Sequence, residues 1–569
     1  MDNFNIIMFV CNWGPHAAFQ ALQDAGSDIP PQVRMVRIPC TGRISKSLLF
    51  KAFEMGADGV ALVGCEPGSC RYGTGTASAE LNVDDTRGIL ELLGLNQTRL
   101  RWATFLPEQS SALLGFLQDF QKDLRAIGRN PVHLAAKADV PRQVLVRGSE
   151  SGTVAGASTA SARKDLTRSA GPSTLPSESA DSGSARSDLT RQLMASHDVY
   201  ACQDCGKCSS ACPLTLSGKS FSPRAMANAI IAGASDSPAV TEDVWSCLTC
   251  GLCYDRCPSA VDFPEFIRDF RSILRADGKP GSEAHGGFFQ SLMRTMAAPA
   301  VKTRRWRDLP QDIQVDPHSK VLFFGGCAPY FDIFFRHHLG VNTRAILFDS
   351  LRLLNFFDIH PALMAEERCC GHDLLWSGDR ENYIRLARLN VDAMQSLGIE
   401  EVVTACPECH RTLAHDYPQQ GIEVGFKVTH IYDLLEREID KGAVGFNKLN
   451  RKVTFQDPCR LSRLEDRADL PRKLLHRLQP KGFEEMRDRG RSALCCGNCA
   501  WVGCDTYSKA LQVKRLRQAH ETGSDLLITA CPKCQIHLRC AMEDPFLEKE
   551  LAMEMMDLTS VMAKTIRWE

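Results

Sequence analysis

The sequence lacks an excess of charge of either sign. Its 569 residues include 67 lysines and arginines against 68 aspartates and glutamates. A protein that binds nucleic acid along the phosphate backbone usually carries a basic excess or a basic stripe. The balance therefore argues against a nucleic-acid partner.

Long hydrophobic runs are missing as well. The longest ones, such as Val321–Cys327, are far shorter than the roughly 20 residues that a membrane helix needs. The first ten residues, MDNFNIIMFV, contain neither the basic segment nor the cleavage site of a secretory signal. We therefore expect a cytoplasmic protein without a transmembrane segment.

Cysteine, in contrast, is abundant, with 25 residues. A disulfide framework would suit a short secreted protein, whereas a long chain without a secretory signal belongs in a reducing compartment. Thiols stay free there, so dense cysteine usually indicates bound metal. The spacing of the cysteines then indicates which metal.

Composition and local patterns predict an α/β multidomain protein in five parts. One part is a linker with hardly an aromatic residue. It cannot bury enough apolar surface to offset its ordering entropy, so we expect it to be disordered and to tether the first domain loosely. The parts are a small flavodoxin-like α/β domain at 1–134, the Ser/Ala/Gly linker at 135–190, a helical ferredoxin-like domain at 191–300, and two α/β domains at 318–440 and 450–569.

The last two domains form an internal duplication. Each opens with a strand that runs into a cysteine, continues through Cys-Cys-Gly and a long amphipathic helix, and ends with a strand into Ala-Cys-Pro-x-Cys. A second, shorter near-repeat pairs Ser161–Arg168 with Ser184–Arg191, and its second copy can begin the helix that enters the helical domain. The long duplication predicts two copies of one α/β unit.

The helical domain contains two runs of the form Cys-x2-Cys-x2-Cys-x3-Cys-Pro, which is the bacterial ferredoxin pattern for two cubane [4Fe-4S] clusters. Three closely spaced thiolates can reach three corners of one cubane, whereas the fourth lies too far around and reaches the other cluster. Zinc also takes Cys-x2-Cys pairs, but it does not explain two four-cysteine runs that end in Cys-Pro. We assign cluster one to Cys202, Cys205, Cys208 and Cys257, and cluster two to Cys247, Cys250, Cys253 and Cys212.

Each α/β unit of the duplication carries five cysteines. Two adjacent thiolates cannot serve one corner of an ordinary tetrahedral site without strain, so five thiolates with a vicinal pair indicate a larger or irregular cluster with bridging sulfurs. Gly371 and Gly497 would let the backbone approach such a cluster closely. The first set is Cys327, Cys369, Cys370, Cys406 and Cys409, and the second set is Cys459, Cys495, Cys496, Cys531 and Cys534.

These repeats resemble the cysteine-rich CCG domains of the B subunit of heterodisulfide reductase, or of its fused D subunit, in which a ferredoxin-like part precedes them as it does here. The resemblance covers roughly residues 196–540. It implies that each five-cysteine set holds a non-cubane [4Fe-4S] cluster, that the ten cysteines form the catalytic centre, and that the two clusters flank the disulfide being cleaved. It also implies a flavin-containing partner like the A subunit of that enzyme.

The first domain offers four cysteines, Cys11, Cys40, Cys65 and Cys70, each near the end of a predicted strand, where ligands gather in open α/β sheets. Four thiolates from separate loops could hold a [2Fe-2S] cluster, and a structural zinc is the alternative.

The pattern around these cysteines resembles the iron–sulfur (delta) subunit of methyl-viologen-reducing hydrogenase, including the stretches Arg37–Arg43 and Lys51–Val60. The resemblance spans about residues 4–125 and implies a [2Fe-2S] cluster that connects a hydrogenase or other electron-input enzyme to heterodisulfide reductase. The family often has Cys-x-x-Cys at the first motif, whereas this sequence has Gly14 at the second position.

Some residues remain without an assigned role. Cys499, Cys504 and Cys540 fall outside every set, and lone buried cysteines are usually small hydrophobic residues. His372 and His410 follow cluster motifs and could donate hydrogen bonds to cluster sulfurs or protonate a product thiolate, or they are ordinary satisfied histidines.

We find no flavin or nicotinamide fingerprint, since the glycines at 73–77 lack the dinucleotide-binding spacing. Because single-electron clusters cannot accept hydride, electrons must come from a partner with a flavin or a hydrogenase centre. The sequence thus predicts a reductase of a small disulfide. The alternative is a non-catalytic electron relay, as in the iron–sulfur subunits of glycolate and glycerol-3-phosphate oxidising enzymes, which connect a flavoprotein to quinone.

Overall fold

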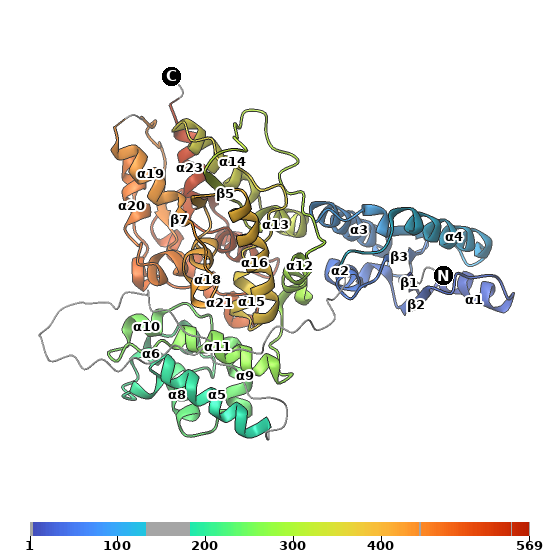
Figure 1. Ribbon diagram of the computed structural model, residues 1–569, viewed down its shortest axis with the longest axis horizontal. Helices are drawn as coiled ribbons and strands as arrows, with labels where there is room; N and C mark the ends of the chain where they lie inside the picture. Colours follow the sequence, from blue (N-terminus) through green and yellow to red (C-terminus); the bar gives the residue numbers. More distant parts are fainter. Residues whose placement is uncertain (1–3, 133–181, 443–444, 548, 568–569) are drawn as a thin grey trace, which may run out of the picture.

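A computed structural model describes residues 4–132, 182–442, 445–547 and 549–567. The predicted linker lies outside the described residues except for its last nine. Figure 1 shows the N-terminal domain as a lobe beside a larger body that the rest of the chain forms.

The N-terminal domain is a parallel four-stranded sheet in the order β2-β1-β3-β4, which is the flavodoxin-like order. Side chains of β1 alternate between the two faces: Ile6, Met8 and Val10 pack with α1 and α4, and Phe9 packs with α2 and α3 on the other face. The elements are β1 Ile6–Cys11, α1 Gly14–Asp24, β2 Val33–Ile38, α2 Lys46–Glu54, β3 Gly59–Gly64, α3 Gly75–Leu92, β4 Leu100–Thr104 and α4 Ser110–Ile127.

The next domain is helical, as expected for a ferredoxin-like unit. Its first helix begins at Ser182, inside the range assigned to the linker, so the second copy of the short near-repeat does enter a helix. The helices are α5 Ser182–Ser196, α6 Lys207–Ala211, α7 Pro213–Leu216, α8 Pro223–Ile231, α9 Pro238–Asp243, α10 Leu252–Arg256, α11 Phe263–Ala276 and α12 Phe288–Met296.

The duplicated part contains two parallel sheets, one in the order β5-β6-β7 and one in the order β11-β10-β8-β9. The first unit contains β5 Val321–Phe324, α13 Ala328–Phe335, α14 Arg344–Phe356, α15 His372–Trp376, α16 Arg380–Ser396, β6 Glu401–Thr404, α17 Pro407–Arg411, α18 Tyr417–Gln419, β7 Lys427–His430 and α19 Ile431–Asp440. The second contains β8 Lys452–Phe455, α20 Leu470–Arg477, β9 Gly482–Phe483, α21 Thr506–Glu521, β10 Leu526–Thr529, α22 Pro532–Met542, β11 Glu554–Asp557 and α23 Leu558–Thr565. Cys327, Cys406, Cys459 and Cys531 follow the carboxyl ends of β5, β6, β8 and β10, whereas the vicinal cysteines lie in loops before α15 and α21.

The N-terminal domain packs against α12 and α13 through a common hydrophobic core. Phe50 of α2 lies 5.3 Å from Phe288 of α12, measured between ring centroids, and both belong to one buried cluster with Phe334 of α13. The buried Lys46 Nζ donates to the carbonyl oxygen of Phe334 at 2.6 Å. The first domain is therefore docked, whereas the linker predicted a loose tether, because linker composition carries no information about the apolar faces that it joins.

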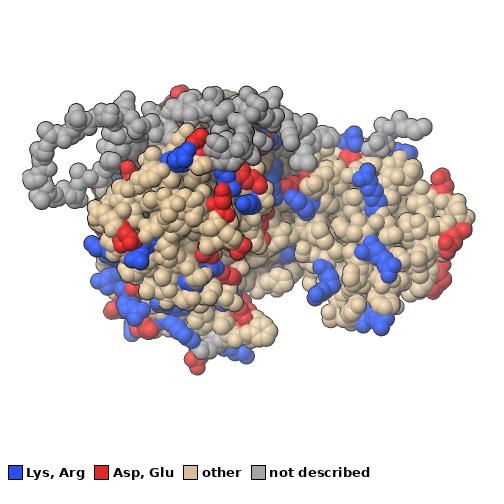
Figure 2. Space-filling model, turned by 90° about the horizontal axis from the view of Figure 1, so that it is seen from below, with Lys and Arg blue, Asp and Glu red and all other residues tan. Residues whose placement is uncertain are grey.

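The structure confirms the predicted fold class of parallel α/β domains around a helical iron–sulfur region. On the face seen in Figure 2, lysines and arginines alternate with aspartates and glutamates over the larger body. Among the described helices, none is both long enough and apolar enough to cross a membrane.

Candidate iron–sulfur centres

The four cysteines of the N-terminal domain lie together at the carboxyl edge of its sheet. Cys11 Sγ is 3.5 Å from Cys65 Sγ, and Cys40 Sγ is 4.0 Å from Cys70 Sγ. Backbone N–H groups of Tyr72, Gly75 and Thr76 outweigh burial and lower the pKa of Cys70. Burial in contrast raises the pKa of Cys11 to about 11 and also raises that of Cys40, so the local hydrogen bonds favour the thiolate, the form that binds metal, at Cys70.

Glycine at the start of α3 keeps this sulfur group open. A Cβ on Gly75 would lie 2.5 Å from Cys40 Sγ and 2.8 Å from Cys70 Sγ. The same holds at the first five-cysteine set, where a Cβ on Gly326 would lie 2.8 Å from Cys409 Sγ. Both positions leave space beside sulfur that any side chain would fill, and the residues present therefore fit a bound cluster.

The ferredoxin-type cysteines lie in two neighbouring groups. Burial raises the pKa of Cys208, and the charges of Cys202 and Cys257 act in the same direction. Burial likewise raises the pKa of Cys212, together with the charge of Cys250. The fourth cysteine of each run is thus close enough to the other run to interact with it electrostatically, and Cys205 is exposed to solvent.

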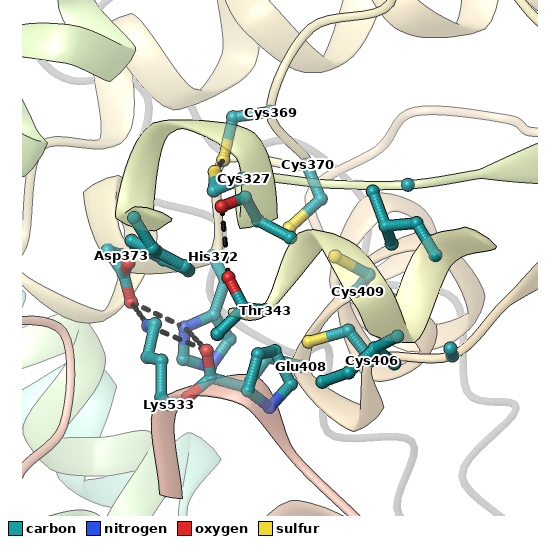
Figure 3. Close-up of a pocket in the computed structure, with 17 residues that line it drawn as sticks. Cys327, Thr343, Cys369, Cys370, His372, Asp373, Cys406, Glu408, Cys409 and Lys533 are labelled. Carbon is teal, nitrogen blue, oxygen red and sulfur yellow. Dashed lines mark hydrogen bonds and ion pairs between the residues drawn. The ribbon is translucent and has the colours of Figure 1, made fainter. Parts of the chain in front are cut away.

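The first five-cysteine set lines a pocket between α13, α14, α15 and α17 (Figure 3). Cys327 Sγ donates to Cys369 Sγ at 2.7 Å. The vicinal Cys370 contacts Cys409, which in turn contacts Cys406. The five sulfurs form one continuous group.

The second set repeats this arrangement and adjoins the first. Cys459 contacts Cys495, and Cys534 contacts both Cys496 and Cys531. Cys406 of the first set accepts hydrogen bonds from Cys409 and from Cys531 of the second set, which lower the pKa of Cys406 to about 5. The ten sulfurs therefore form an unbroken series across the two repeats.

The second set also adjoins the ferredoxin-type cysteines. Burial raises the pKa of Cys250, and the negative charge of Cys459 adds to that effect. The series of sulfur groups thus extends from the helical domain, through the second set, to the first set.

Gly371 and Gly497 adopt backbone conformations that favour glycine, and the Gly371 N–H donates to Cys369 Sγ at 3.4 Å. Both have positive φ, 85° and 100°, which disfavours residues other than glycine. A Cβ on Gly371 would meet the Tyr383 ring at 2.9 Å, and one on Gly497 would meet the Ser508 carbonyl oxygen at 2.6 Å.

Charged side chains form one wall of the pocket at the first set (Figure 3). Lys533 lies between Cys531 and Cys534 in sequence, and its ammonium group contacts Glu408 at 2.6 Å and also Asp373. His372 Nδ1 lies 2.9 Å from Asp373 Oδ1. Burial holds the pKa of His372 well below its usual value, so the ring is neutral at pH 7.

These contacts answer the question that the sequence left open about the two histidines. His372 and His410 contact carboxylates: His372 is paired with Asp373, and His410 Nδ1 lies 3.0 Å from Glu465. It is instead His537 that contacts a set cysteine, with Nδ1 at 3.1 Å from Cys496 Sγ.

Sequence reasoning did not identify Lys533, Glu408 or His537. A signal for the first two was present, since Cys-Pro-Glu-Cys and Cys-Pro-Lys-Cys place opposite charges at equivalent positions of the duplication. No comparable pattern marks His537.

The three unassigned cysteines stay outside the sulfur groups. Cys499 is buried, with its sulfur 3.1 Å from Thr249 Oγ1 and 3.0 Å from Arg460 Nη2. Cys540 Sγ lies 3.1 Å from Lys509 Nζ, and Cys504 is exposed.

Comparison with known families matches each part of the chain separately. The family of the methyl-viologen-reducing hydrogenase delta subunit matches residues 6–128, and the 4Fe-4S dicluster domain matches residues 184–261. The cysteine-rich domain family matches twice, at residues 321–414 and 453–539.

The D subunit of the dihydromethanophenazine:CoB–CoM heterodisulfide reductase of Methanosarcina barkeri is 32% identical over 238 residues, which are 40% of this chain and 56% of the relative. The chain is a homologue of this heterodisulfide reductase component. It spans about half the length of the curated relative, and it adds a hydrogenase delta-type domain that the matched region does not include.

Two further relatives extend the comparison to other parts of the chain. The B subunit of the fumarate reductase (CoM/CoB) of Methanothermobacter marburgensis is 25% identical over 63% of this chain and 60% of the relative. The iron–sulfur D subunit of the F420-non-reducing hydrogenase vhc of Methanococcus voltae is 30% identical over 22% of this chain and 85% of the relative. The family matches and the cysteine groups together identify an iron–sulfur protein related to oxidoreductase subunits.

Proposed function

We infer that the chain is an electron-transfer subunit that reduces a small disulfide at two neighbouring non-cubane [4Fe-4S] clusters. The ligands would be the two five-cysteine sets, and the contact between Cys406 and Cys531 is the observation that carries the proposal. Iron–sulfur clusters supply single electrons and a Lewis-acidic iron. Two such clusters side by side could together supply the two electrons that cleavage of a disulfide requires.

The balance of the reaction is simple. The S–S bond of the substrate breaks, two electrons from the protein and two protons from water are taken up, and two thiols leave. Cys327, Cys406 and Cys459 are the partly exposed members of the two sets, and the other seven cysteines are buried. A substrate would therefore reach the centre on the side of these three residues.

Electrons would follow the series of sulfur groups. Cluster one would have the exposed Cys205 as a ligand, and the Cys250 ligand of cluster two would be near Cys459 of the second set. The N-terminal cysteines would hold a [2Fe-2S] cluster that receives electrons from a flavin-containing partner like the A subunit of heterodisulfide reductase, from a hydrogenase, or from another electron-input enzyme.

The experiment is a turnover assay with anaerobically purified protein, reduced methyl viologen and the CoB–CoM heterodisulfide named for the relatives. Oxidation of viologen that depends on the disulfide, with release of two thiols per disulfide, supports the proposal. A Cys406→Ser variant should lose this activity.

The second candidate is an electron relay between a flavoprotein and quinone. The burial of seven of the ten set cysteines favours it, because a relay needs no substrate access. Protein that oxidises viologen with a quinone analogue, but not with the disulfide, would support the relay.

A further inference from the structure

Three buried arginines surround the junction between the second ferredoxin-type run and the second five-cysteine set. Arg271, Arg460 and Arg463 are 0%, 2% and 5% exposed. A guanidinium stays charged in a protein, so each burial is costly unless an anion compensates it. The hydrogen bonds of the three side chains show what they have in place of a carboxylate.

Arg271 of α11 donates to main-chain carbonyl groups. Its Nη2 atom bonds the carbonyl oxygen of Cys247 at 2.6 Å and that of Val244 at 2.9 Å, and its Nη1 atom bonds the carbonyl oxygen of Trp376 at 2.9 Å. Burial lowers the pKa of Arg271, and the neighbouring Cys247 and Cys499 only partly offset that effect.

Arg460 connects three parts of the chain. Its Nη1 atom donates to the carbonyl oxygen of Thr249, between Cys247 and Cys250, at 2.6 Å, and its Nε atom donates to His372 Nε2 at 3.2 Å. The guanidinium lies 4.2 Å from the centre of the Trp376 ring. Its Nη2 atom lies 3.0 Å from Cys499 Sγ, and its Nη1 atom lies 3.9 Å from Cys459 Sγ.

Arg463 completes the group. A π-helical turn at Arg460–Leu464 directly follows Cys459, and it carries Arg463 to the carbonyl oxygens of Cys250 at 2.7 Å and Ala493 at 2.6 Å. Its Nη2 atom is buried without a hydrogen-bond partner. Within the described residues, none of the three arginines forms an ion pair with a carboxylate.

The first five-cysteine set has different surroundings. Arg305 lies beside it and is paired with Glu367, both fully buried. Lys533 is paired with Glu408 and Asp373. These two cations in and beside the first-set pocket are thus paired with carboxylates, whereas none of the three arginines at the junction forms such a pair within the described residues.

We propose that Arg271, Arg460 and Arg463 are the counter-charge for the two clusters held at Cys250 and Cys459, and that they make the second set a better electron acceptor than the first. Thiolate-bound clusters are anionic, and a nearby positive charge of low solvent exposure favours addition of an electron. Electrons that leave cluster two would therefore be held at the second set before the first set takes them.

The test compares Arg460→Gln, which removes the charge, with Arg460→Lys, which keeps it. Potentiometric titrations of the loaded protein, followed by electron paramagnetic resonance, measure the midpoint potentials. Arg460→Gln should lower the midpoint potential of the second-set centre, and Arg460→Lys should leave that potential nearer the wild-type value. The first-set centre should keep its potential in both variants. As a control, Arg305→Gln combined with Glu367→Gln removes a pair without net charge and should shift neither potential.

A second arm compares thermal unfolding with and without clusters. Without clusters the Gln variant should melt at a higher temperature than the Lys variant, because it buries no uncompensated charge, and with clusters the order should reverse. An unchanged second-set potential in Arg460→Gln, or the same melting order in both states, overturns the proposal.

The inference rests on the proposed electron route, but neither measurement uses a disulfide. A protein with the expected potentials and melting order that reduces no disulfide would contradict the proposed function alone.

Discussion

Lys533 Nζ lies 2.6 Å from Glu408 Oε2, and the two residues occupy equivalent positions in the two repeats. Lys533 also contacts Asp373. The pairing holds the second repeat against the pocket wall of the first, since α22 brings Lys533 into the pocket that α13, α14, α15 and α17 form. The duplication has thus produced an ion pair across its own interface.

We expect Lys533→Met to destabilise the cluster-free chain by about 3–5 kcal/mol, because it leaves two buried carboxylates without their cation. Glu408→Gln should cost less, since Asp373 still pairs with Lys533. In the double variant the loss of unfolding free energy should be smaller than the sum of the losses in the two single variants. Urea unfolding under anaerobic conditions would measure these losses. Additive effects would show that the pair is not coupled.

Gly75→Val should prevent cluster assembly in the N-terminal domain, because the new side chain would occupy the space beside Cys40 and Cys70. Of about 18 irons expected per chain, from four four-iron clusters and one two-iron cluster, about two should be lost. The matched control is Gly115→Ala in α4, where an added Cβ meets nothing within 4 Å. It should keep all iron and gain up to about 1 kcal/mol of stability. Full iron content in Gly75→Val would place that cluster elsewhere.

The crossed ligand sets of the helical domain make a spectroscopic prediction. Cys212→Ser should change the electron paramagnetic resonance signal of the same cluster that Cys250→Ser changes, because Cys212 lies beside Cys250. Cys208→Ser should change the other signal, since Cys208 lies beside Cys202 and Cys257. If Cys212→Ser and Cys208→Ser alter one and the same signal, the ligands are not crossed.

Asp269 gives the chain an acid-sensitive contact. Burial alone would raise the pKa of Asp269, but Arg268 and His197 hold this pKa well below its usual range. The stability from this carboxylate is complete above its unfolded-state pKa of about 3.9 and is lost as the pH falls through the lower folded-state value.

Asp269→Asn should therefore lower the free energy of unfolding of the cluster-free chain at pH 7, and the deficit should shrink below about pH 4. Urea unfolding at a series of pH values measures this difference. Asp188→Asn, at an exposed position of α5, should show no such trend. A deficit that stays constant down to about pH 3 would contradict the assignment.

Much of the fold was predictable because the duplicated strands, the helices and the cysteines are local in sequence. The short apolar runs Val33–Ile38 and Gly59–Val63 indicate strands in the sequence, and they form β2 and most of β3. α3 is harder to predict, because it begins at Gly75, whereas the helical pattern in the sequence starts only at Thr86. The glycine and threonine residues at its start suggest a loop and give no helical periodicity.

The relationships between repeats were not predictable. The contact of Cys406 with Cys531, and the contacts of Arg460 with Thr249 and His372, join residues that only tertiary packing brings together. The docking of the N-terminal domain was missed for a related reason. The apolar stripes of α2 and α12 do not differ in sequence from stripes that face a domain's own interior.

The shared core between α2, α12 and α13 limits how the chain can be divided for expression. A fragment that begins at Ser182 would expose Phe288 and Phe334, which the N-terminal domain now covers. Contiguous exposed aromatic surface promotes self-association. The solubility of the remaining domains thus depends on the N-terminal domain that covers these aromatic side chains.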